Sequence, residues 1–431
     1  MKILRLSELD EKERSRLVSR SLPELDRAKE AVSGILRDVK KEGDKALVDY
    51  TAKFDKTTLK RGEIRVKKSE IEEAYRLVSK EGVEALRRVI RNLETVNRKL
   101  LPSKDIVEVE DGMLVWNAFR PIRSAGIYAP GGRASYPSTV LMAAVPAKVA
   151  GVKRLVLCTP PLPNKKVNPY TLVAADMTEV DDVYKVGGAQ AIAAMAYGTE
   201  TVPKVDKIVG PGNVYVTAAK LMVTDEVGID FPAGPSEVLI VADETVDASY
   251  LAMDLISQAE HDPDSSAMLV TPSLGLAKKV QRLVEAIAKE VERRNVVEEC
   301  LSKNGAIIVT ESLESALDFA NEYAPEHLEL VIERPERVFD KIENAGTVFV
   351  GPYSPVPLGD YYSGSSHILP TGRCARIYSG LSARDFLREI TFQMATKEAL
   401  RRARKVVKTL TEIEGLPSHM RAVEERFKDG S

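Results

Sequence analysis

Four histidines, the only ones in the chain, all lie in polar or turn-rich stretches. They are His261 in SQAEHDPD, His327 in APEHLEL, His367 in LGDYYSGSSHILPTG and His419 in IEGLPSHMRAV. Imidazole transfers protons near neutral pH and is the commonest metal ligand in proteins. A single histidine of this kind is usually a structural residue, but four in such settings favour one shared site.

Metal binding is one use of such a set. Gln258 and His261 are three residues apart, so they share a face if LAMDLISQAEH is helical. Asp360 and His419 would add a hard oxygen and a second imidazole, and this set suits zinc or another borderline divalent ion. There is no HExxH motif. Spacing does not decide against two other candidate ligands, Glu260 and His367.

Proton transfer and nucleophilic attack need different residues. Glu326 and His327 could act as an activator of water and a general base, if the backbone turns enough for both to face one pocket. Cys374, in PTGRCARIYSG, has the most plausible setting for a nucleophilic thiol. No histidine or basic group is placed in the sequence to lower its pKa, so we expect no catalytic thiol.

Three glycine-rich stretches could admit a ligand close to the backbone. IVGPGNVYVTAAKLMV (208–223) is an apolar run, a tight turn and a helix, an arrangement whose free N–H groups can bind a phosphate. The other two are AGIYAPGGRASYPSTV (125–140) and KVGGAQAIAAMAYG (185–198). The dinucleotide fingerprint GxGxxG is absent, since position 215 is Tyr, and an ordinary strand-to-helix turn stays open as the alternative.

The bulk composition restricts the class of protein. A length of 431 residues predicts two to four domains, at about 100 to 200 residues per domain. The 62 Lys+Arg nearly balance the 64 Asp+Glu, so there is no basic footprint for nucleic acid or an anionic membrane. We therefore expect small-molecule partners, with no nucleic acid and no membrane.

Cysteine usage and hydropathy predict a cytoplasmic protein. Cys158, Cys300 and Cys374 are far apart, odd in number and in no CxxC pair, which argues against disulfides and thiolate zinc sites. The N-terminal residues have no sustained apolar core. The most apolar stretch, TVLMAAVPAKVAGV, is interrupted by Pro146 and Lys148 well short of a membrane span.

The periodicity of apolar residues predicts an α/β protein. Residues 23–100 read as helices, and from about residue 120 short β-branched runs alternate with helical stretches, which predicts parallel sheets. Whether they form one sheet or two stays open, with a possible seam near residue 233. We expect residues 382–431 to be helical again. The predicted strands are 154–158, 183–188, 206–212, 236–243, 266–272, 306–310, 327–332 and 347–351.

Eight motifs in order resemble one family, histidinol dehydrogenase, the last enzyme of histidine biosynthesis. Four positions depart from the usual pattern without removing a ligand or a base: Thr139, Phe231, Ser366 and Ser418. The motifs, from about residue 120 onward, are AGIYAPGGRASYPSTVLM, GGAQAIAAMAYGT, VDKIVGPGNVYVTAAK, AGPSEVLIVAD, SQAEHDPD, APEHLEL, LGDYYSGSSHILPTG and EGLPSHMRAV.

With this resemblance we expect two Rossmann-like parallel-sheet domains, a helical N-terminal section and a small helical C-terminal tail. Residues 1–22 would form a helical segment that packs with the C-terminal part. Residues 23–125 plus 235–381 would form the first α/β domain, and 126–234 the second, nucleotide-binding one. The C-terminal region, 382–431, would reach the partner subunit.

The resemblance also implies an activity and its residues. An enzyme of this family oxidises L-histidinol through L-histidinaldehyde to L-histidine, reduces two NAD and uses one Zn²⁺ per subunit. It is an intertwined homodimer in which the tail completes the partner's site. The implied acid-base residues are Glu326 and His327, and the implied metal ligands are Gln258, His261, Asp360 and His419. The implied substrate contacts are the four metal ligands together with His327, Ser236, His367 and Glu414. The implied cofactor contacts are Tyr128, Gln190 and Asn213.

Two other functions remain as alternatives at this stage. A metal-dependent hydrolase of a small amine or amide would use the same His/Asp/Gln set to activate water. A non-catalytic nucleotide-binding protein would use only the glycine loops.

In the dehydrogenase mechanism that the resemblance implies, the metal would orient the substrate, His327 would take the hydroxyl proton and Glu326 would help a water molecule to add to the aldehyde.

Overall fold

The structure is a computed structural model that describes residues 1–19, 22–131 and 136–428. The chain forms two compact units. The first unit consists of Met1–Leu100 with Ile122–Phe386, and the second of Leu101–Pro121 with Leu387–Ser431. The second unit is therefore built from two segments that are far apart in the sequence.

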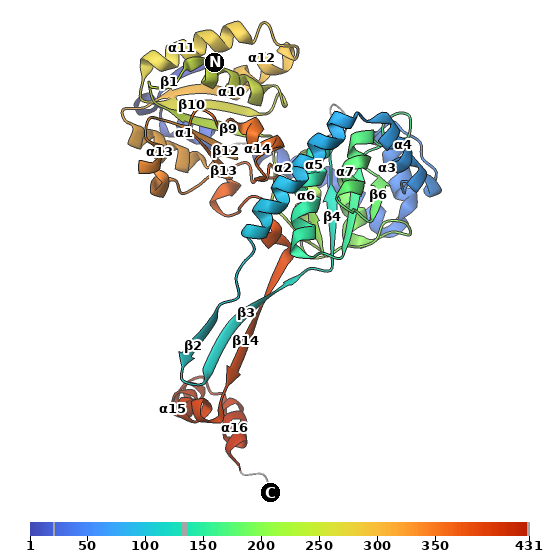
Figure 1. The fold of residues 1–431 in the computed structure, drawn as a ribbon, viewed down its shortest axis with the longest axis vertical. Helices are drawn as coiled ribbons and strands as arrows, with labels where there is room; N and C mark the ends of the chain where they lie inside the picture. The colour runs from blue at the N-terminus through green and yellow to red at the C-terminus, as the bar shows by residue number, and fades with distance from the viewer. Residues whose placement is uncertain (20–21, 132–135, 429–431) are drawn as a thin grey trace. The chain divides into compact units, whose positions relative to one another are not determined.

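A six-stranded parallel sheet forms one half of the first unit (Figure 1). Its strand order is β1-β11-β10-β9-β12-β13, and every pair of neighbours is parallel. The strands are β1 (Lys2–Arg5), β9 (Glu237–Ala242), β10 (Ser266–Thr271), β11 (Gly305–Val309), β12 (His327–Val331) and β13 (Thr347–Val350).

Helices cover both faces of this sheet, which explains its continuous apolar strands. In β9, Val238 and Ile240 pack with the helices of one face, and Leu239 and Val241 with those of the other. Consecutive side chains point to opposite faces, so a strand buried on both sides is apolar throughout. The helices are α10 (Ala248–Ala259), α11 (Leu274–Ile287) and α12 (Arg294–Lys303) on one face, and α1 (Glu11–Val18) and α13 (Leu313–Tyr323) on the other.

A five-stranded parallel sheet, of order β6-β5-β4-β7-β8, forms the other half of the first unit. Helices again cover both of its faces. The prediction of two parallel sheets, each covered by helices, is therefore confirmed. The strands are β4 (Ser124–Tyr128), β5 (Arg154–Thr159), β6 (Asp182–Lys185), β7 (Lys207–Val209) and β8 (Gly228–Ile229). The helices are α6 (Pro137–Ala150) and α7 (Pro169–Met177) on one face, and α8 (Gly188–Tyr197) and α9 (Val214–Met222) on the other.

The predicted helical section is present, and its helices pack on the five-stranded sheet. Helix α2 contacts α8 and α9, α4 contacts α7, and α5 contacts α6. Residues 23–125 were predicted to form one domain with 235–381. The pattern of an amphipathic helix shows that one face is buried, but it does not show which sheet that face packs on. Both sheets lie in the first unit, so the boundary between the two α/β domains stays a prediction. The helices are α2 (Leu22–Glu42), α3 (Asp44–Phe54), α4 (Lys68–Leu77) and α5 (Lys80–Lys99).

Residues 1–22 were expected to be helical, but the first of them are not. The chain begins with β1, in which Lys2 pairs with Ala306 of β11. A short 3₁₀ turn, Leu6–Glu8, follows before α1. A four-residue strand shows little periodicity of its own, and its partner lies about three hundred residues away.

The second unit contains a three-stranded antiparallel sheet, of order β14-β3-β2, which the sequence did not predict. The expectation that 382–431 is helical is wrong for β14 (Leu387–Ala395). Pairing with β3 explains the strand: Phe392 lies opposite Trp116, and their rings stack with centroids 5.4 Å apart. The other elements are β2 (Ile106–Glu110), β3 (Met113–Pro121), α15 (Lys397–Ile413), α16 (Pro417–Glu424) and the 3₁₀ turn Glu425–Phe427.

Short helices complete the first unit, and α14 (Val356–Tyr361) is the one that contributes to the site below. Within the described residues, no helix is both long and apolar enough to cross a membrane. The 3₁₀ turns are Arg61–Glu63, Pro335–Arg337, Phe339–Lys341, Cys374–Arg376 and Ala383–Phe386.

Candidate active site

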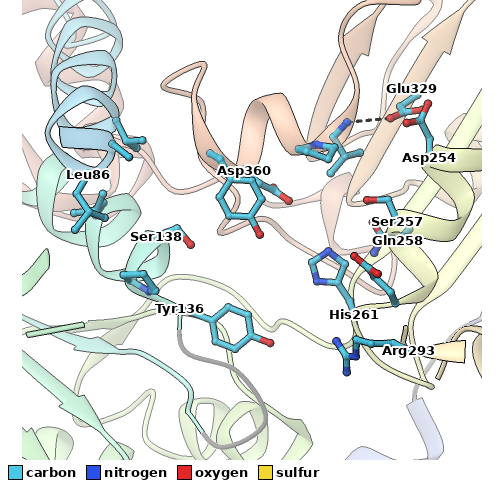
Figure 2. A pocket seen from close by; sticks show the side chains of 18 residues that line it. Leu86, Tyr136, Ser138, Asp254, Ser257, Gln258, His261, Arg293, Glu329 and Asp360 are labelled. Carbon is cyan, nitrogen blue, oxygen red and sulfur yellow. Dashed lines mark hydrogen bonds between the residues drawn. The ribbon is translucent and has the colours of Figure 1, made fainter. Parts of the chain in front are cut away.

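A cavity of about 550 Å³ lies in the first unit, between α10 and α14 on one side and α5 and the start of α6 on the other (Figure 2). It brings Gln258, His261 and Asp360, three of the four predicted metal ligands, to one place. The remaining polar lining residues are Tyr136, Ser138, Asp254, Ser257, Glu260, Arg293, Glu329 and Tyr361.

The end of α10 positions two of the predicted ligands. Gln258 is 3% exposed, and its Nε2 has no hydrogen-bond partner in the described part of the chain. His261 follows the helix, and its backbone N–H donates to the carbonyl of Gln258 at 3.3 Å. Burial lowers the pKa of His261, with smaller contributions from His327 and Arg293, so the imidazole is neutral, as a metal ligand must be.

Glu326 and His327 are both buried and lie within reach of each other. The Oε2 of Glu326 is 3.4 Å from Nδ1 of His327. Both groups are held by one backbone residue, Glu237: its N–H donates to Glu326 Oε2 at 2.8 Å, and its carbonyl lies 2.9 Å from His327 Nδ1. The other ring nitrogen of His327, Nε2, lies 4.0 Å from Asp360 Oδ1 and has no hydrogen-bond partner among the described residues.

Burial and the close carboxylates shift the pKa values of this group. Burial lowers the pKa of His327, but Glu326 and then Asp360 outweigh it and raise that pKa to about 9. Burial raises the pKa of Glu326, and His327 opposes the shift. Burial also raises the pKa of Asp360 to about 6, again opposed by His327. Such strongly perturbed groups around one cavity are typical of a functional site.

Two predicted substrate residues are close to this group but do not line the cavity. The Nε2 of His367 lies 3.2 Å from Thr139 Oγ1 on α6. Burial lowers the pKa of His367 to about 4, which keeps its ring neutral. Ser236 comes directly before Glu237, the residue that holds Glu326 and His327, and its carbonyl accepts from Ser266 N–H at 3.0 Å.

The remaining predicted metal ligand, His419, and the predicted substrate contact Glu414 are in the second unit. Glu414 caps the C-terminus of α15, His419 is on α16, and both are exposed. Across residues 1–19, 22–131 and 136–428, no group of three or more His, Cys, Asp or Glu is arranged to hold a metal ion. The metal therefore stays a prediction.

The predicted cofactor residues lie at the carboxyl ends of strands in the five-stranded sheet. Tyr128 ends β4, and its hydroxyl accepts from the N–H of Gly188, at the start of α8, at 3.1 Å. Gln190 is 1% exposed, and neither polar atom of its amide has a hydrogen-bond partner in the described structure. Asn213 caps α9, with its Oδ1 accepting from the N–H groups of Tyr215 and Val216.

Glycine brings two of the loops at this edge close to a third. A Cβ on Gly131 would lie 2.8 Å from the ring of Pro160, which follows β5, and a Cβ on Gly187 would lie 2.6 Å from the same residue. Ligands in open α/β sheets bind at such carboxyl edges. Two of the three glycine-rich stretches of the sequence therefore meet at this edge of the sheet.

Sequence reasoning missed two carboxyl groups that line the cavity, Asp254 and Glu329 (Figure 2). Burial, and then the charge of Asp254, raises the pKa of Glu329 to about 8, and burial raises that of Asp254 to about 6. Glu329 Oε1 accepts from Val356 N–H, the first residue of α14, at 3.0 Å. Their spacing was a usable signal: Asp254 is one helical turn before Gln258, and Glu329 is two residues after His327, on the same strand face.

Two of the three cysteines, Cys158 and Cys300, are buried and do not have the setting of a catalytic thiol. None of the three forms a disulfide. Burial raises the pKa of the Cys158 thiol and raises that of Cys300 to about 12. A buried thiol with a raised pKa is a poor nucleophile.

Fold and site together define an α/β enzyme that carries a buried Glu–His pair and a nitrogen- and oxygen-rich cavity. The family model described as histidinol dehydrogenase matches residues 18–427. The chain therefore belongs to the histidinol dehydrogenase family, an oxidoreductase family of histidine biosynthesis.

Individual relatives agree with this assignment over the full length. The chain is 47% identical to a histidinol dehydrogenase of Methanothermobacter thermautotrophicus over 427 residues, which cover 99% of this chain and 100% of the relative. It is 46% identical to one of Methanocaldococcus jannaschii, covering 99% of each. The crystal structure of histidinol dehydrogenase from Elizabethkingia anophelis superposes with a TM-score of 0.93 at 42% identity, covering 97% of this chain and 96% of that one.

Proposed function

We propose that this protein oxidises L-histidinol through L-histidinaldehyde to L-histidine and reduces two NAD in each turnover. One observation carries the proposal: the Glu326–His327 pair lies beside the cavity that Gln258, His261 and Asp360 line. A base, a water-activating carboxylate and a set of nitrogen and oxygen ligands are the groups that two oxidations at one carbon require.

We propose that one Zn²⁺ per subunit is held by Gln258, His261 and Asp360 and by the partner's His419. The residues fit: the amide of Gln258 is buried with an unpaired polar atom, His261 is neutral, and Asp360 offers a carboxylate at the same cavity. Amide nitrogen and oxygen are assigned rather than observed, so rotation of the Gln258 amide would present its oxygen. When bound, zinc would hold the imidazole and amino nitrogens of the substrate and so orient the carbinol carbon.

His327 is the proposed general base for both hydride transfers. Its Nδ1 faces the carbonyl of Glu237, which accepts the N–H, so Nε2 is the atom that takes the substrate proton in the neutral imidazole, a form that the pKa of about 9 makes dominant only at alkaline pH. In the first oxidation, Nε2 would accept the hydroxyl proton, and NAD, when bound, would supply the hydride acceptor for the carbinol carbon. The product is an aldehyde, and Nε2 must lose its proton before the second oxidation.

Glu326 is the proposed activator of water for the second oxidation. Its carboxylate takes a proton from water as the water oxygen adds to the aldehyde carbon, and the protonated Nε2 of His327 gives its proton to the carbonyl oxygen, so the product is a neutral hydrate. His327 would then accept a hydroxyl proton of the hydrate, and a second NAD, when bound, would supply the hydride acceptor, which leaves the carboxylic acid. Water attack needs no thiol, which agrees with the raised pKa values of the buried Cys158 and Cys300.

The remaining substrate and cofactor contacts are also proposals. Ser236 and His367 would contact the substrate from the first unit, and Glu414 from the partner's tail. Tyr128, Gln190 and Asn213 would contact NAD, and the unpaired, buried amide of Gln190 supports a polar ligand at this place.

We propose a homodimer in which the second unit contributes to the partner's site. Large apolar side chains are exposed on the second unit, and such a surface marks an interaction site. They include Ile390, Phe392 and Met394 of β14, and Val406, Leu410 and Ile413 of α15. We also propose a cytoplasmic location, which fits the absence of disulfides among the three cysteines.

The direct test follows the absorbance of reduced NAD with L-histidinol as substrate. A histidinol dehydrogenase gives a signal, whereas a hydrolase or a nucleotide-binding protein gives none. Chelation should abolish the signal and added zinc should restore it. His327→Asn should abolish both oxidations, and retention of either at more than about one per cent would contradict its role as the base.

A further inference from the structure

Lys220 and Asp230 form a buried ion pair that the proposed chemistry does not use. Lys220 is on α9 and Asp230 follows β8, and their side chains are 2% and 0% exposed. Transfer of two charges from water into a protein interior is costly. Such a pair is retained at little net cost only where further hydrogen bonds satisfy both groups.

Both charges hold the same backbone residue, Gly210. Its N–H donates to Asp230 Oδ2 at 2.8 Å, and its carbonyl accepts from Lys220 Nζ at 3.0 Å. Gly210 has φ of +120°, and a Cβ there would lie 2.1 Å from the carbonyl oxygen of Tyr128. The ion pair therefore fixes Gly210, directly after β7, in a backbone conformation that residues with a Cβ rarely adopt, at the start of the glycine-rich turn 210–213.

The other end of this turn is fixed by Asn213. Its Oδ1 accepts from the N–H groups of Tyr215 and Val216, both at 3.1 Å. A Cβ on Gly212 would lie 2.3 Å from Val216 Cγ1, so the turn also packs closely on the first turn of α9. Two residues, Pro211 and Gly212, lie between the two anchors.

We propose that Lys220 and Asp230 are positioning residues that preorganise the turn 210–213 for the dinucleotide. The inference rests on the proposed NAD-dependent function, because Asn213 is an expected cofactor contact. A turn that is already ordered does not lose conformational freedom on binding, so it binds its ligand more tightly. An apolar pair could fill the same volume, but it could not hold the N–H and carbonyl of Gly210.

The test separates stability from positioning with the double variant Lys220→Met/Asp230→Leu. An apolar replacement of a buried ion pair keeps the fold, so its thermal midpoint should stay close to that of the native protein. Its dissociation constant for NAD, measured by calorimetry, should rise about tenfold, because the turn must be ordered on binding. Affinity for L-histidinol should change less than about twofold, because its site is formed by other elements.

Two further variants complete the comparison. Lys207→Met is the matched control. Lys207 is a mostly buried lysine at the start of β7, the strand that precedes Gly210, and it donates to the carbonyl of Asp385 at 2.7 Å. It should lower stability and leave NAD affinity within about twofold. Asp230→Asn keeps the volume of the pair but not its charge, and should weaken NAD binding about threefold or more even if the double variant fails to fold.

Amide hydrogen exchange gives a readout that does not need NAD. Exchange across 208–214 should be faster in the variants of the pair than in Lys207→Met. Unchanged exchange and unchanged NAD affinity in these variants would overturn the positioning role. If the native protein itself does not bind NAD, the proposed function fails, while faster exchange would still show that the pair holds the turn.

Discussion

Glu326 and His327 are neighbours in the chain, and a regular strand would send their side chains to opposite faces. The backbone before them is not regular: Ala324 has φ of 48° in the left-handed region, Pro325 follows, and β12 begins only at His327. The backbone groups of Glu237 then hold both side chains. Both side chains therefore contact the same backbone residue, which the proposed action on one substrate carbon requires.

The division of labour between these residues predicts an unequal effect of Glu326→Gln. The amide can keep the hydrogen bond from Glu237 N–H but cannot take a proton from water. Oxidation of L-histidinaldehyde should slow by about 10²- to 10⁴-fold, the usual contribution of a general base, while alcohol oxidation should lose less than about tenfold. The two half-reactions are measured separately by supplying either substrate, and equal losses would refute the assignment.

The raised pKa of Glu329 predicts a pH-dependent contribution to stability. In the pH range between its ordinary pKa of 4.5 and about 8, the folded protein binds a proton that the unfolded chain has lost. This stabilisation is complete below the lower value and is lost as pH rises through the upper one, by at most about 1.4 kcal/mol per pH unit.

The variant Glu329→Gln removes this group from the titration. The difference in unfolding free energy between native protein and variant should change steadily from pH 5 to pH 8, in favour of the native protein at the acid end. Urea unfolding at several pH values measures it. A difference that is constant with pH would show that Glu329 has an ordinary pKa.

At this scale, spacing predicted part of the site. Gln258 and His261 share a cavity, as three-residue spacing at the end of a helix indicated. The role of Glu237 could not be predicted, because its backbone rather than its side chain holds Glu326 and His327. The unpaired amide of Gln190 is likewise invisible in a sequence, since a missing partner is a property of packing.

At the scale of elements, most strands that are buried on both faces were predictable, but the buried β4 was missed, as were the exposed strands and the strand β1, whose partner is far away in the sequence. All eight predicted runs are strands, because each is a short apolar segment between turns. Strand β14 was predicted as a helix. Its short alternation of apolar and polar residues lies next to a long helical pattern, and its partner strand β3 is about 270 residues away in the sequence. Pairing over such distances leaves no local signal.

The turn before β12 depends on a glycine in the neighbouring segment. The N–H of Gly346 donates to the carbonyl of Pro325 at 2.9 Å, and a Cβ on Gly346 would lie 2.6 Å from the carbonyl oxygen of Glu326. Gly346→Ala should therefore displace the turn and destabilise the protein by about 1 to 3 kcal/mol, with a loss of activity.

Gly34 on α2 is the matched control, since a Cβ there would meet no atom within 4 Å. Gly34→Ala should stabilise the protein by about 0.5 to 1 kcal/mol and leave activity unchanged, because alanine favours a helix interior. Urea unfolding and initial rates measure both variants. A Gly346→Ala protein as stable and active as the native one would show that the turn adapts easily.

At the scale of the whole molecule, the site is incomplete in one chain if the proposed dimer is correct. The cavity in the first unit has three of the four expected ligands, and His419 and Glu414 belong to the second unit. A single sequence shows that such residues exist, but not which copy of the chain uses them.

Mixing two inactive variants tests whether the tail acts on the partner. Asp360→Asn and His419→Ala should each be nearly inactive alone. A hybrid dimer has one site with both native residues, so refolding an equal mixture should restore about a quarter of native activity. Recovery near zero would show that Asp360 and His419 of the same chain form the site.

The central claim is that one chain type carries out both oxidations, and the stoichiometry of NAD reduction tests it most directly. A limiting, known amount of L-histidinol is converted to completion with excess NAD and zinc, and reduced NAD is measured by absorbance. We expect two NAD reduced for each L-histidinol, with L-histidine as the product. One NAD reduced for each L-histidinol, with the aldehyde accumulating, would contradict the proposed role of Glu326, and no reduction would contradict the proposed function as a whole.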